Sequence, residues 1–385
     1  MSHLPALPPR VPPEVPLGAD ILCLGEAPGK KESDFGRPFI GASGQLLRWA
    51  LHQVGFQKER VAYANVLPFR PPDNNLTAFC VSKVELRNVE CPDWYRALPN
   101  TVPGQIIHPG LGVPALEELH ELIRTMRPRI IISLGNTACW ATLHQTGIEK
   151  LRGAPYWSAR ADRDGMASKV LATYHPAAVI RNYKQLTVFQ LDLLKALNES
   201  ETAGIVWPER WLEIATSPGQ IAAWLGAMAA PGSPLPAVNG CPPTAMPGHS
   251  TAFVACDVET ERKPGPNITL IGFAPVPHLG LVIPFINPLA ADRCYFSRED
   301  EKQVILLIKA FMENPSVRKC WHNCLYDLPW IHSYGINPQN AYFDTMLMSH
   351  ALWPEMRKSL RLLGSILTNE RNWKFLRTKS NKRED

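Results

Sequence analysis

The sequence predicts an α/β protein with a mostly parallel sheet in its first half and a second α/β domain after it. The main observation is that apolar, strand-like runs alternate with helical segments through the first half, a pattern that places helices on both faces of a parallel sheet. The other observation is size. A chain of 385 residues with 45% apolar and 19% charged side chains is longer than one core normally supports, so we expect two domains.

The first half supplies four strands and the helices that join them. The expected strands are 20–25, 61–66, 129–134 and 170–174, and the expected helices are 43–54, 114–126, 136–144 and 186–197. Ligands of parallel sheets bind at the carboxyl ends of the strands. We therefore expect a site in the loops that begin at Gly25, Asn65, Gly135 and His175.

The second half begins after a boundary that we place at 200–207. Its expected strands are 211–215, 253–260, 268–273, 280–285 and 317–321, and its expected helices are 218–228, 298–312 and 358–363. The sequence therefore divides into a leader at 1–17, one domain at 18–200, a second domain at 205–370 and a basic tail at 371–385.

Proline is about twice as frequent as in ordinary proteins, with 37 residues in the chain. Twelve of them fall in two short stretches, 5–16 and 231–247. Because proline fixes φ and removes a backbone donor, the first stretch predicts an extended leader. The second has the composition of a linker, but a strand and a helix precede it, so we expect a long loop inside the second domain.

Charge and cysteine content limit the class of protein. The formal net charge is +5, and the tail 371–385, with six Lys/Arg and two acids, supplies +4 of it. The rest of the chain is nearly neutral, so we expect affinity for nucleic acid to depend on charged residues around the two sites. Nine scattered cysteines indicate reduced thiols rather than a disulfide framework. No apolar run approaches the ~20 residues of a membrane span and no signal peptide is evident, which predicts a cytoplasmic protein without a membrane partner.

Four motifs occupy the expected site loops. They are GEAPG at 25–29, GRPFIGASG at 36–44, NVLPFRPP at 65–72 and YHPAAVIRN at 174–182. Each taken alone has an ordinary explanation as a turn, a buried Phe, a capping Asn or a packed His. Together and in this order, over residues 18–197, they resemble the uracil-DNA glycosylase superfamily, particularly its family 4 type.

The resemblance implies that the protein flips uracil out of DNA and hydrolyses its N-glycosidic bond. Phe39 would stack on the uracil ring, and the Asn65 amide would donate to O4 and accept from N3–H. Cytosine reverses both groups, so a fixed Asn rejects it. His175 would stabilise the charge that grows on O2. Glu26 would position the attacking water, although a Glu after Gly25 would also serve to brace the loop.

Residues around these motifs are candidates for contacts with DNA. Glycines allow close approach of the backbone, and cations can hold phosphates, although each cation alone has the ordinary reading of a solvated charge. The glycines are Gly25, Gly29, Gly36, Gly41 and Gly44, and the cations are Lys30, Lys31, Arg37, Arg181 and Lys184. Val179 and Ile180 are candidates for an apolar wedge in the vacated base stack, and equally for the core.

One departure from the family pattern concerns cofactors. The resemblance implies an iron-sulfur cluster held by four cysteines, two of them in a C-x-x-C ahead of the first strand. The leader here has no cysteine, and Phe69 stands where a third ligand would be expected. Cys80 and Cys91 cannot hold a cluster by themselves. We therefore predict no iron-sulfur cluster and no cofactor for the glycosylase.

The second half carries a different set of motifs. An apolar strand ends in D-x-E at Asp257 and Glu259, N-x-x-x-D follows with Asp327, and FDTM lies at 343–346. Together these resemble the 3′-5′ exonuclease domain of DEDD type that is attached to family A DNA polymerases, on a ribonuclease H-like fold. The resemblance implies two Mg²⁺ or Mn²⁺ ions, with Asp257, Glu259 and Asp327 as three of the four carboxylate ligands.

The fourth ligand of that site is normally an Asp in a Y-x-x-x-D or H-x-x-x-D motif. No Tyr or His follows His350, so the motif is absent from this sequence and we expect impaired nuclease activity. Either the domain is a degenerate binding module, or a DNA polymerase chain supplies the missing parts. A zinc site at Cys320, His322 and Cys324 is disfavoured by their spacing on a strand-to-helix turn.

The sequence thus predicts a uracil-DNA glycosylase for DNA repair, joined to an incomplete exonuclease-like domain, from a phage or another compact replication system. One alternative is a metal-dependent exonuclease or proofreading subunit whose first domain only binds DNA. Another is a non-enzymatic polymerase accessory protein. The expected partners are uracil-containing DNA and a polymerase chain.

Overall fold

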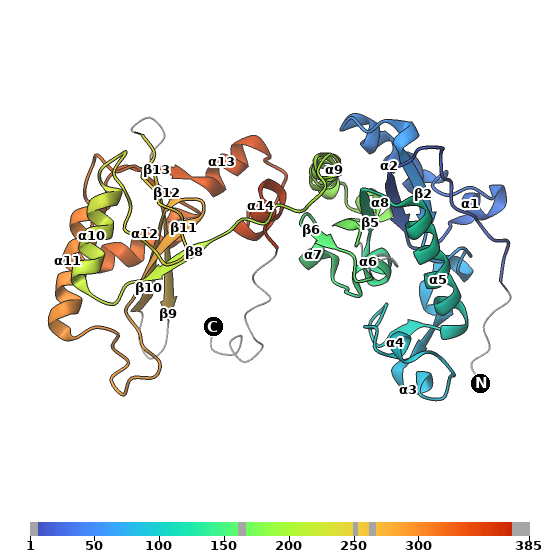
Figure 1. Ribbon diagram of the computed structural model, residues 1–385, viewed down its shortest axis with the longest axis horizontal. Helices are drawn as coiled ribbons and strands as arrows, with labels where there is room; N and C mark the ends of the chain where they lie inside the picture. The colour runs from blue at the N-terminus through green and yellow to red at the C-terminus, as the bar shows by residue number, and fades with distance from the viewer. Residues whose placement is uncertain (1–6, 161–166, 249–252, 262–266, 372–385) are drawn as a thin grey trace. The chain divides into compact units, whose positions relative to one another are not determined.

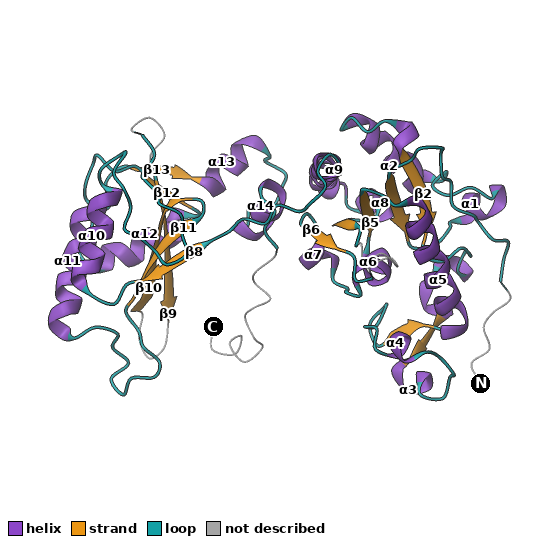
Figure 2. Cartoon of the chain, in the orientation of Figure 1, coloured by secondary structure: helices purple, strands orange, loops and turns teal. Residues whose placement is uncertain are grey.

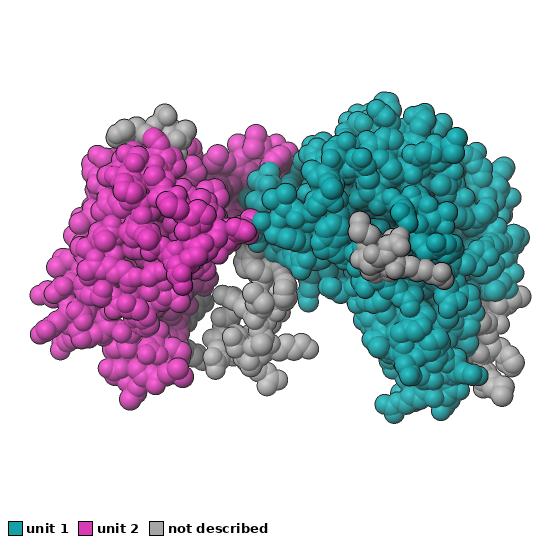
Figure 3. All heavy atoms as spheres, viewed as in Figure 1, with its two compact units in different colours: residues 1–207, 361–375 teal, residues 208–360, 376–385 magenta. Residues whose placement is uncertain are grey.

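The computed structural model describes residues 7–160, 167–248, 253–261 and 267–371. These residues form two compact units (Figure 3), unit 1 within 1–207 and 361–375 and unit 2 within 208–360. The basic tail predicted at 371–385 lies outside the described residues except for Arg371. None of the described helices combines the length and the apolar composition that a bilayer crossing requires.

Unit 1 is built on a five-stranded sheet in the order β2-β1-β5-β7-β6 (Figure 1). All pairs are parallel except β6–β7. The strands are β1 (Ile21–Gly25), β2 (Val61–Asn65), β5 (Ile130–Leu134), β6 (Pro155–Trp157) and β7 (Lys169–Thr173). Their side chains are buried almost throughout, which explains the unbroken apolar runs. The four predicted parallel strands are confirmed within one residue at each end, and β6 was not predicted.

The helices of unit 1 connect these strands and cover the sheet. The longer ones are α2 (Ala42–Gln53), α5 (Pro109–Met126), α6 (Asn136–Leu143) and α9 (Leu186–Ser200), and the shorter ones are α1 (Lys30–Phe35), α3 (Lys83–Leu86), α4 (Asp93–Arg96), α7 (Ile148–Leu151) and α8 (Pro176–Arg181). Helix α5 starts five residues earlier than predicted because the His108 side chain caps it and Pro109 fits the first turn. A two-stranded ribbon, β3 (Cys80–Ser82) with β4 (Gln105–Ile107), was also not predicted.

The proline-rich leader packs along the outer edge of β2. Val11 is buried and its N–H donates to the carbonyl of Pro68 at 2.8 Å. Glu14 and Tyr63 exchange two backbone hydrogen bonds of 2.8 Å each. The leader is extended, as predicted, and in addition it supplies a carboxylate, because Arg48 and Arg37 both pair with Glu14.

Unit 2 contains a six-stranded mixed sheet in the order β13-β12-β9-β10-β11-β8 (Figure 2). Strands β9, β10 and β11 are antiparallel neighbours, whereas β12, β13 and β8 pair in parallel. The strands are β8 (Trp211–Ile214), β9 (Val254–Glu261), β10 (Asn267–Val276), β11 (Leu279–Pro284), β12 (Lys319–Trp321) and β13 (Ala341–Asp344). The helices are α10 (Pro218–Met228), α11 (Arg298–Met312), α12 (Cys324–Ser333), α13 (Thr345–Leu352) and α14 (Leu360–Leu367).

Two segments bear on the expected organisation. The described part of the second proline stretch runs between α10 and β9 as a loop with one isolated bridge, Pro234 to Ala245, so it lies inside unit 2 as expected. Residues 361–371 differ from expectation. The sequence assigned 361–370 to the second domain and 371 to the tail, but these residues pack with unit 1.

Helix α2 packs unusually close to the Phe39 loop. A Cβ at Gly44 would lie 2.1 Å from the carbonyl carbon and oxygen of Phe39. We expect Gly44→Ala to lower the unfolding free energy of unit 1 by about 2 kcal/mol, because two backbone segments must move apart. Denaturant unfolding measures this change.

Gly29→Ala is the matched control in the neighbouring loop. Its φ is −81°, and no described atom lies within 4 Å of an added Cβ. The expected change is within about 0.5 kcal/mol. Equal stabilities of the Gly44→Ala and Gly29→Ala variants would contradict this packing.

Candidate active site

The carboxyl ends of neighbouring strands bring three of the predicted site residues together. Gly25 and Asn65 are register partners at the ends of β1 and β2. A Cβ added to Gly25 would lie 2.5 Å from Asn65 Oδ1 and 2.7 Å from Phe39 Cζ. The Asn65 amide and the Phe39 ring therefore both approach the backbone of Gly25, and only glycine leaves room for them.

Phe39 is held in a conformation that nonglycine residues rarely adopt. Its φ is 55° and its side chain is 3% exposed. Arg48 Nε donates to the Phe39 carbonyl at 3.2 Å, and the Arg48 guanidinium lies 3.9 Å from the centroid of the Tyr63 ring. The strained turn is thus fixed from α2, and it directs the ring toward Gly25 and Asn65.

The Asn65 side chain carries an unused hydrogen-bond donor. Its amide nitrogen, Nδ2, is buried and has no hydrogen-bond partner among the described residues. Leaving a buried donor unpaired costs about 1–3 kcal/mol. Asn65 Nδ2 is one of seven buried, unpaired side-chain N or O atoms among the described residues, distinguished by its place at the end of β2 beside Gly25 and Phe39. The position predicts a ligand that places an acceptor against Nδ2.

His175 follows β7 and is neutral in this environment. The Ala177 N–H donates to His175 Nδ1 at 3.2 Å, so the proton of the neutral ring is assigned to Nε2. Burial, with a smaller contribution from the charge of Arg181, lowers the pKa of His175 to about 4. Gly135 allows the loop to pass closely, since its φ is 85° and a Cβ there would lie 3.1 Å from His175 Cβ. The imidazole can therefore donate from Nε2.

Glu26 is fixed from helix α6. Its Oε2 accepts from Thr137 Oγ1 at 2.5 Å, and its backbone carbonyl accepts from the N–H of Leu67 at 3.0 Å. The side chain is half-buried. The sequence did not identify Thr137, whose only signal is its place in the first turn of the helix after Gly135.

Glu32 is a buried carboxylate that sequence reasoning missed. It accepts the N–H of Gly29 at 2.9 Å, and the N–H groups of Phe39, Ile40 and Gly41 also bond to it. Burial raises the pKa of Glu32, and these four donors oppose that rise. The carboxylate therefore joins the GEAPG loop to the Phe39 loop. The available signal was the spacing G-x-x-E, a capping box with glycine in the cap position.

The predicted rim residues separate into two groups. Arg37 pairs with Glu14 at 3.1 Å, and Gly41 donates its N–H to Glu32, so both are engaged in holding the loops. Arg181, Lys184, Lys30 and Lys31 are exposed. Val179 is fully buried, which favours the core alternative for it over the wedge, whereas Ile180 is 48% exposed.

The cysteines do not form a cluster site. Cys80 and Cys91 are half-buried and pack with Phe69 against the core of unit 1. Within the described ranges, no group of three or more His, Cys, Asp or Glu residues is arranged to hold a metal ion. The residues present therefore do not fit an iron-sulfur cluster, and its absence stays a prediction.

The predicted metal ligands of unit 2 lie on β9 and in the first turn of α12, and Asp257 and Asp327 interact electrostatically. Asp257 and Glu259 are exposed on one face of β9, and Asp327 Oδ1 accepts the N–H of Val258 between them at 3.2 Å. Burial and the neighbouring Asp257 raise the pKa of Asp327 to about 7. Among the described residues, these carboxylates do not form a group arranged to hold a metal ion. Asp344 of the FDTM motif caps α13, accepting the N–H groups of Met346 and Leu347.

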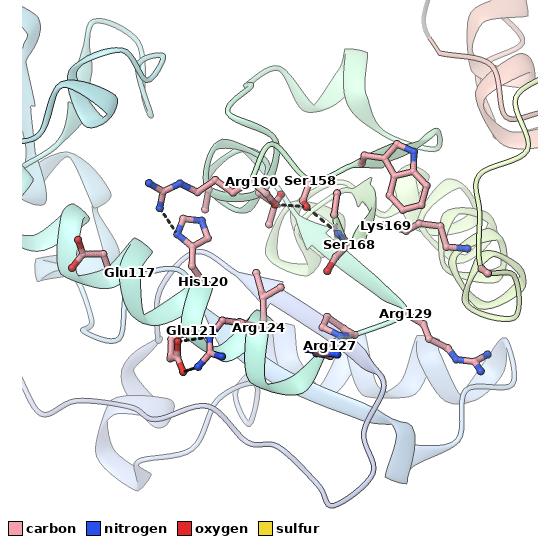
Figure 4. A pocket seen from close by; sticks show the side chains of 17 residues that line it. Glu117, His120, Glu121, Arg124, Arg127, Arg129, Ser158, Arg160, Ser168 and Lys169 are labelled. Atoms are coloured by element: carbon pink, nitrogen blue, oxygen red, sulfur yellow. Dashed lines mark hydrogen bonds and ion pairs between the residues drawn. The ribbon is translucent and has the colours of Figure 1, made fainter. Parts of the chain in front are cut away.

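A cavity of about 490 Å³ lies away from these motifs (Figure 4). It lies beside the amino ends of β5 and β7 and has many cations in its wall. Those cations already have partners within unit 1: Arg124 with Glu121, Arg129 with Asp20, Arg160 with His120, and Lys169 with the Glu199 carbonyl. Because its charges are engaged and the motifs lie at the opposite sheet edge, we place the candidate site at Gly25, Asn65 and His175.

Comparison with known proteins identifies the family of the first half of the chain. Residues 12–199 match the family model of the uracil DNA glycosylase superfamily. The Type-4 uracil-DNA glycosylase of Pyrobaculum aerophilum is 32% identical over 188 residues, covering 48% of this chain and 79% of that protein. The Archaeoglobus fulgidus protein of the same name is 31% identical, covering 46% and 75%. The chain belongs to the uracil-DNA glycosylase superfamily.

The glycosylase match ends near the close of α9, and a second family follows it. Residues 284–384 match the family model of a 3′-5′ exonuclease. Among solved structures, Escherichia coli RNase D has a TM-score of 0.30 and 18% identity, covering 46% of this chain and 36% of that one. The catalytic core of RRP6 from Trypanosoma brucei has a TM-score of 0.31 and 13% identity, covering 60% and 54%. The predicted α/β fold class and the two family resemblances are confirmed.

The neutrality of His175 in this glycosylase-family site gives a direct prediction. Because its folded pKa of about 4 lies below the ordinary value, the unfolded chain binds the proton first. The stabilising contribution of neutral His175 is complete above about pH 6.5 and is lost as the pH falls from there toward 4. Long-range ¹H–¹⁵N spectra should show a proton on Nε2 and a titration midpoint near 4. A midpoint between 6 and 7 would contradict the burial described above.

Proposed function

We propose that this protein excises uracil from DNA by hydrolysing the N-glycosidic bond. The observation that carries the proposal is the buried, unpaired Asn65 Nδ2 beside the Phe39 ring and Gly25. The Type-4 uracil-DNA glycosylases that the chain resembles support the same reaction. The substrate would be a uracil nucleotide flipped out of the DNA stack.

Recognition would depend on the two ends of the Asn65 amide. Uracil offers an acceptor at O4 and a donor at N3–H, which match Nδ2 and Oδ1. Cytosine offers a donor at N4 and an acceptor at N3. Its donor would face the Nδ2 donor and its acceptor would face Oδ1, so neither hydrogen bond could form. Sites built to hydrogen-bond one partner discriminate strongly against the other. The buried Phe39 ring would stack on the flipped base.

Bond cleavage would draw on His175 and Glu26. As the bond from C1′ to N1 breaks, its electron pair leaves with the base, and negative charge gathers partly on O2. A neutral His175 that donates from Nε2 can stabilise that charge without first losing a proton. Glu26, held by Thr137, would orient the water that adds to C1′ and would accept its proton.

Contacts with the DNA would come from the exposed rim of the same sheet edge. Arg181 and Lys184 are exposed beside the His175 loop and would meet phosphates. Ile180, 48% exposed in α8, would fill the space of the flipped base. Arg37 would contribute less, because it already pairs with Glu14.

For unit 2 we propose a role in binding, with nuclease activity impaired. Asp327 Oδ1 accepts the N–H of Val258, between Asp257 and Glu259 on β9, and Asp327 lies within the residues that match the 3′-5′ exonuclease family. Mg²⁺ or Mn²⁺ held there would activate water in an active nuclease. The arrangement of these carboxylates does not support a metal site among the described residues. A DNA polymerase chain is the partner we propose for this unit.

A substitution at Asn65 tests the excision chemistry. Asn65→Asp replaces the donor with an acceptor, so we expect the kcat/KM for uracil release from single- and double-stranded oligonucleotides to fall by about 100-fold or more. Alkali cleavage of the abasic sites, with EDTA present, measures the product.

Asn75→Asp is the matched control for this change. The exposed Asn75 caps a turn through Oδ1, which accepts the Thr77 N–H, and Asp preserves that acceptor. We expect this variant to retain wild-type activity. If neither wild type nor Asn65→Asp produces abasic sites, the proposal is wrong.

A nuclease assay tests the role of unit 2. With 5′-labelled DNA that lacks uracil, we expect no shortening by wild type or Asp327→Asn in Mg²⁺ or Mn²⁺. Uracil release should be the same with EDTA as with metal, because no metal is assigned to that step. Mn²⁺-dependent shortening that disappears in Asp327→Asn would instead show a working metal site.

A further inference from the structure

The C-terminal segment, defined here as residues 361–371, packs with the glycosylase-family unit although it lies within the exonuclease-family match. It contains most of helix α14, and Leu363 and Ile366 of that helix are buried. The strand–helix pattern of unit 1 does not require it. Its contacts therefore indicate what the segment contributes to unit 1.

The centre of this contact is a buried ion pair. Arg152 and Asp192 are 4% and 0% exposed. Arg152 Nε donates to Asp192 Oδ2 at 2.9 Å, and Nη2 donates to Oδ1. A further donor, Arg152 Nη1, bonds to Ser365 Oγ at 3.0 Å. The segment thus provides a partner for a buried guanidinium group that would otherwise lose a hydrogen bond.

Gly153 permits the approach of the segment. Its φ is 81°, and a Cβ there would lie 2.9 Å from the Ser365 carbonyl oxygen. Lys195 Nζ donates to the Gly153 carbonyl at 2.7 Å and to the Ser365 carbonyl at 2.9 Å, and it also bonds the carbonyl of Thr368. A cation therefore sits at the carboxyl end of α14, where carbonyls lack helical partners.

The end of the segment is held by two more residues. Asn369 Nδ2 donates to Glu199 Oε1 at 3.0 Å and to the Val206 carbonyl at 3.1 Å. The Arg371 guanidinium lies 4.8 Å from the Tyr156 ring centroid and 4.3 Å from that of Trp207. Because both rings belong to unit 1, Arg371 gains cation–π contacts there.

The buried pair also reaches the end of β7, two residues before His175. Asp192 Oδ2 accepts from Thr173 Oγ1 at 2.7 Å, and Thr173 is the last residue of β7. The Arg152 guanidinium lies 5.7 Å from the centroid of the Tyr174 ring. Ser365 is thus linked through Arg152 and Asp192 to the two residues that precede His175.

We propose that Arg152, Gly153, Asp192, Lys195 and Glu199 form a docking surface for the chain's own C-terminal segment, and that docking holds the His175 end of β7. The exonuclease-matched region and the glycosylase unit are then not independent modules, because excision depends on the docked segment. The activity part of this inference rests on the proposed uracil excision, whereas the docking part does not.

The test uses the full-length chain with Ser365→Phe, whose ring cannot fit against Gly153. Leu367→Phe is the matched control, since Leu367 is in the same helix and 64% exposed. Hydrogen exchange followed by mass spectrometry should show peptides covering 361–371 exchanging at least tenfold faster in Ser365→Phe, and peptides covering 169–177 at least threefold faster. The control should match wild type.

Uracil release and the milder variant Arg371→Ala test whether docking affects excision. The kcat/KM for uracil release should fall at least fivefold in Ser365→Phe. Arg371→Ala, which leaves the buried pair intact, should speed exchange of 361–371 by a smaller factor and rules out a general folding defect as the cause. Unchanged exchange of 361–371 in Ser365→Phe would overturn the docking surface. Faster exchange there with unchanged 169–177 and unchanged activity would overturn the link to His175.

If wild type releases no uracil, the proposed function fails on that result alone. The exchange measurements still decide between docking and no docking, so the two failures are distinguishable.

Discussion

The close approach of the Asn65 amide and the Phe39 ring to the backbone of Gly25 is the constraint on which the site depends. A single Cβ at position 25 would meet both groups at less than 3 Å. The last residue of β1 must therefore be glycine, and the adjacent strand must place its last side chain opposite that residue. Parallel pairing of β1 and β2 achieves this by aligning Gly25 with Asn65. Every other element of the site keeps this arrangement in place or adds a reactive group to it.

Several hydrogen bonds and an ion pair hold the Phe39 loop in place. Glu32 gathers backbone donors from two loops, Arg48 binds the carbonyl of Phe39, and Glu14 of the leader pairs with Arg48. These contacts stabilise a positive φ at a residue that disfavours it. In contrast, the Asn65 amide nitrogen is left without a partner among the described residues. The polar groups that hold the Phe39 loop are thus paired, whereas Asn65 Nδ2 beside it is not.

The sequence predicted the elements that depend on local pattern. The bounds of α10 and α11 match expectation at both ends, and the four strands predicted for unit 1 lie within one residue of expectation. The approach of Gly25 to Asn65 also followed from the rule for strand ends. What it missed depends on contacts distant in sequence. Glu32 bonds to backbone groups in a later loop, and Thr137 reaches Glu26 across 111 positions.

Two further features depend on helix orientation and on contacts distant in sequence. Val179 and Ile180 are adjacent and chemically similar, so only the orientation of α8 decides that the first is buried and the second exposed. The docking of 361–371 rests on a buried Arg152–Asp192 pair whose third partner lies 213 positions away from Arg152. No periodicity in the segment itself signals such a contact.

The account's central claim is that Asn65 Nδ2–H is held unpaired for the O4 of uracil. The most direct measurement follows the side-chain amide of Asn65 in ¹H–¹⁵N spectra of the full-length protein as uracil or cytosine is added. The account predicts that uracil shifts the Asn65 Nδ2 proton downfield as a new hydrogen bond forms, and that cytosine at the same concentration leaves it unchanged. Equal shifts with both bases, or none with uracil at saturating concentration, would contradict it.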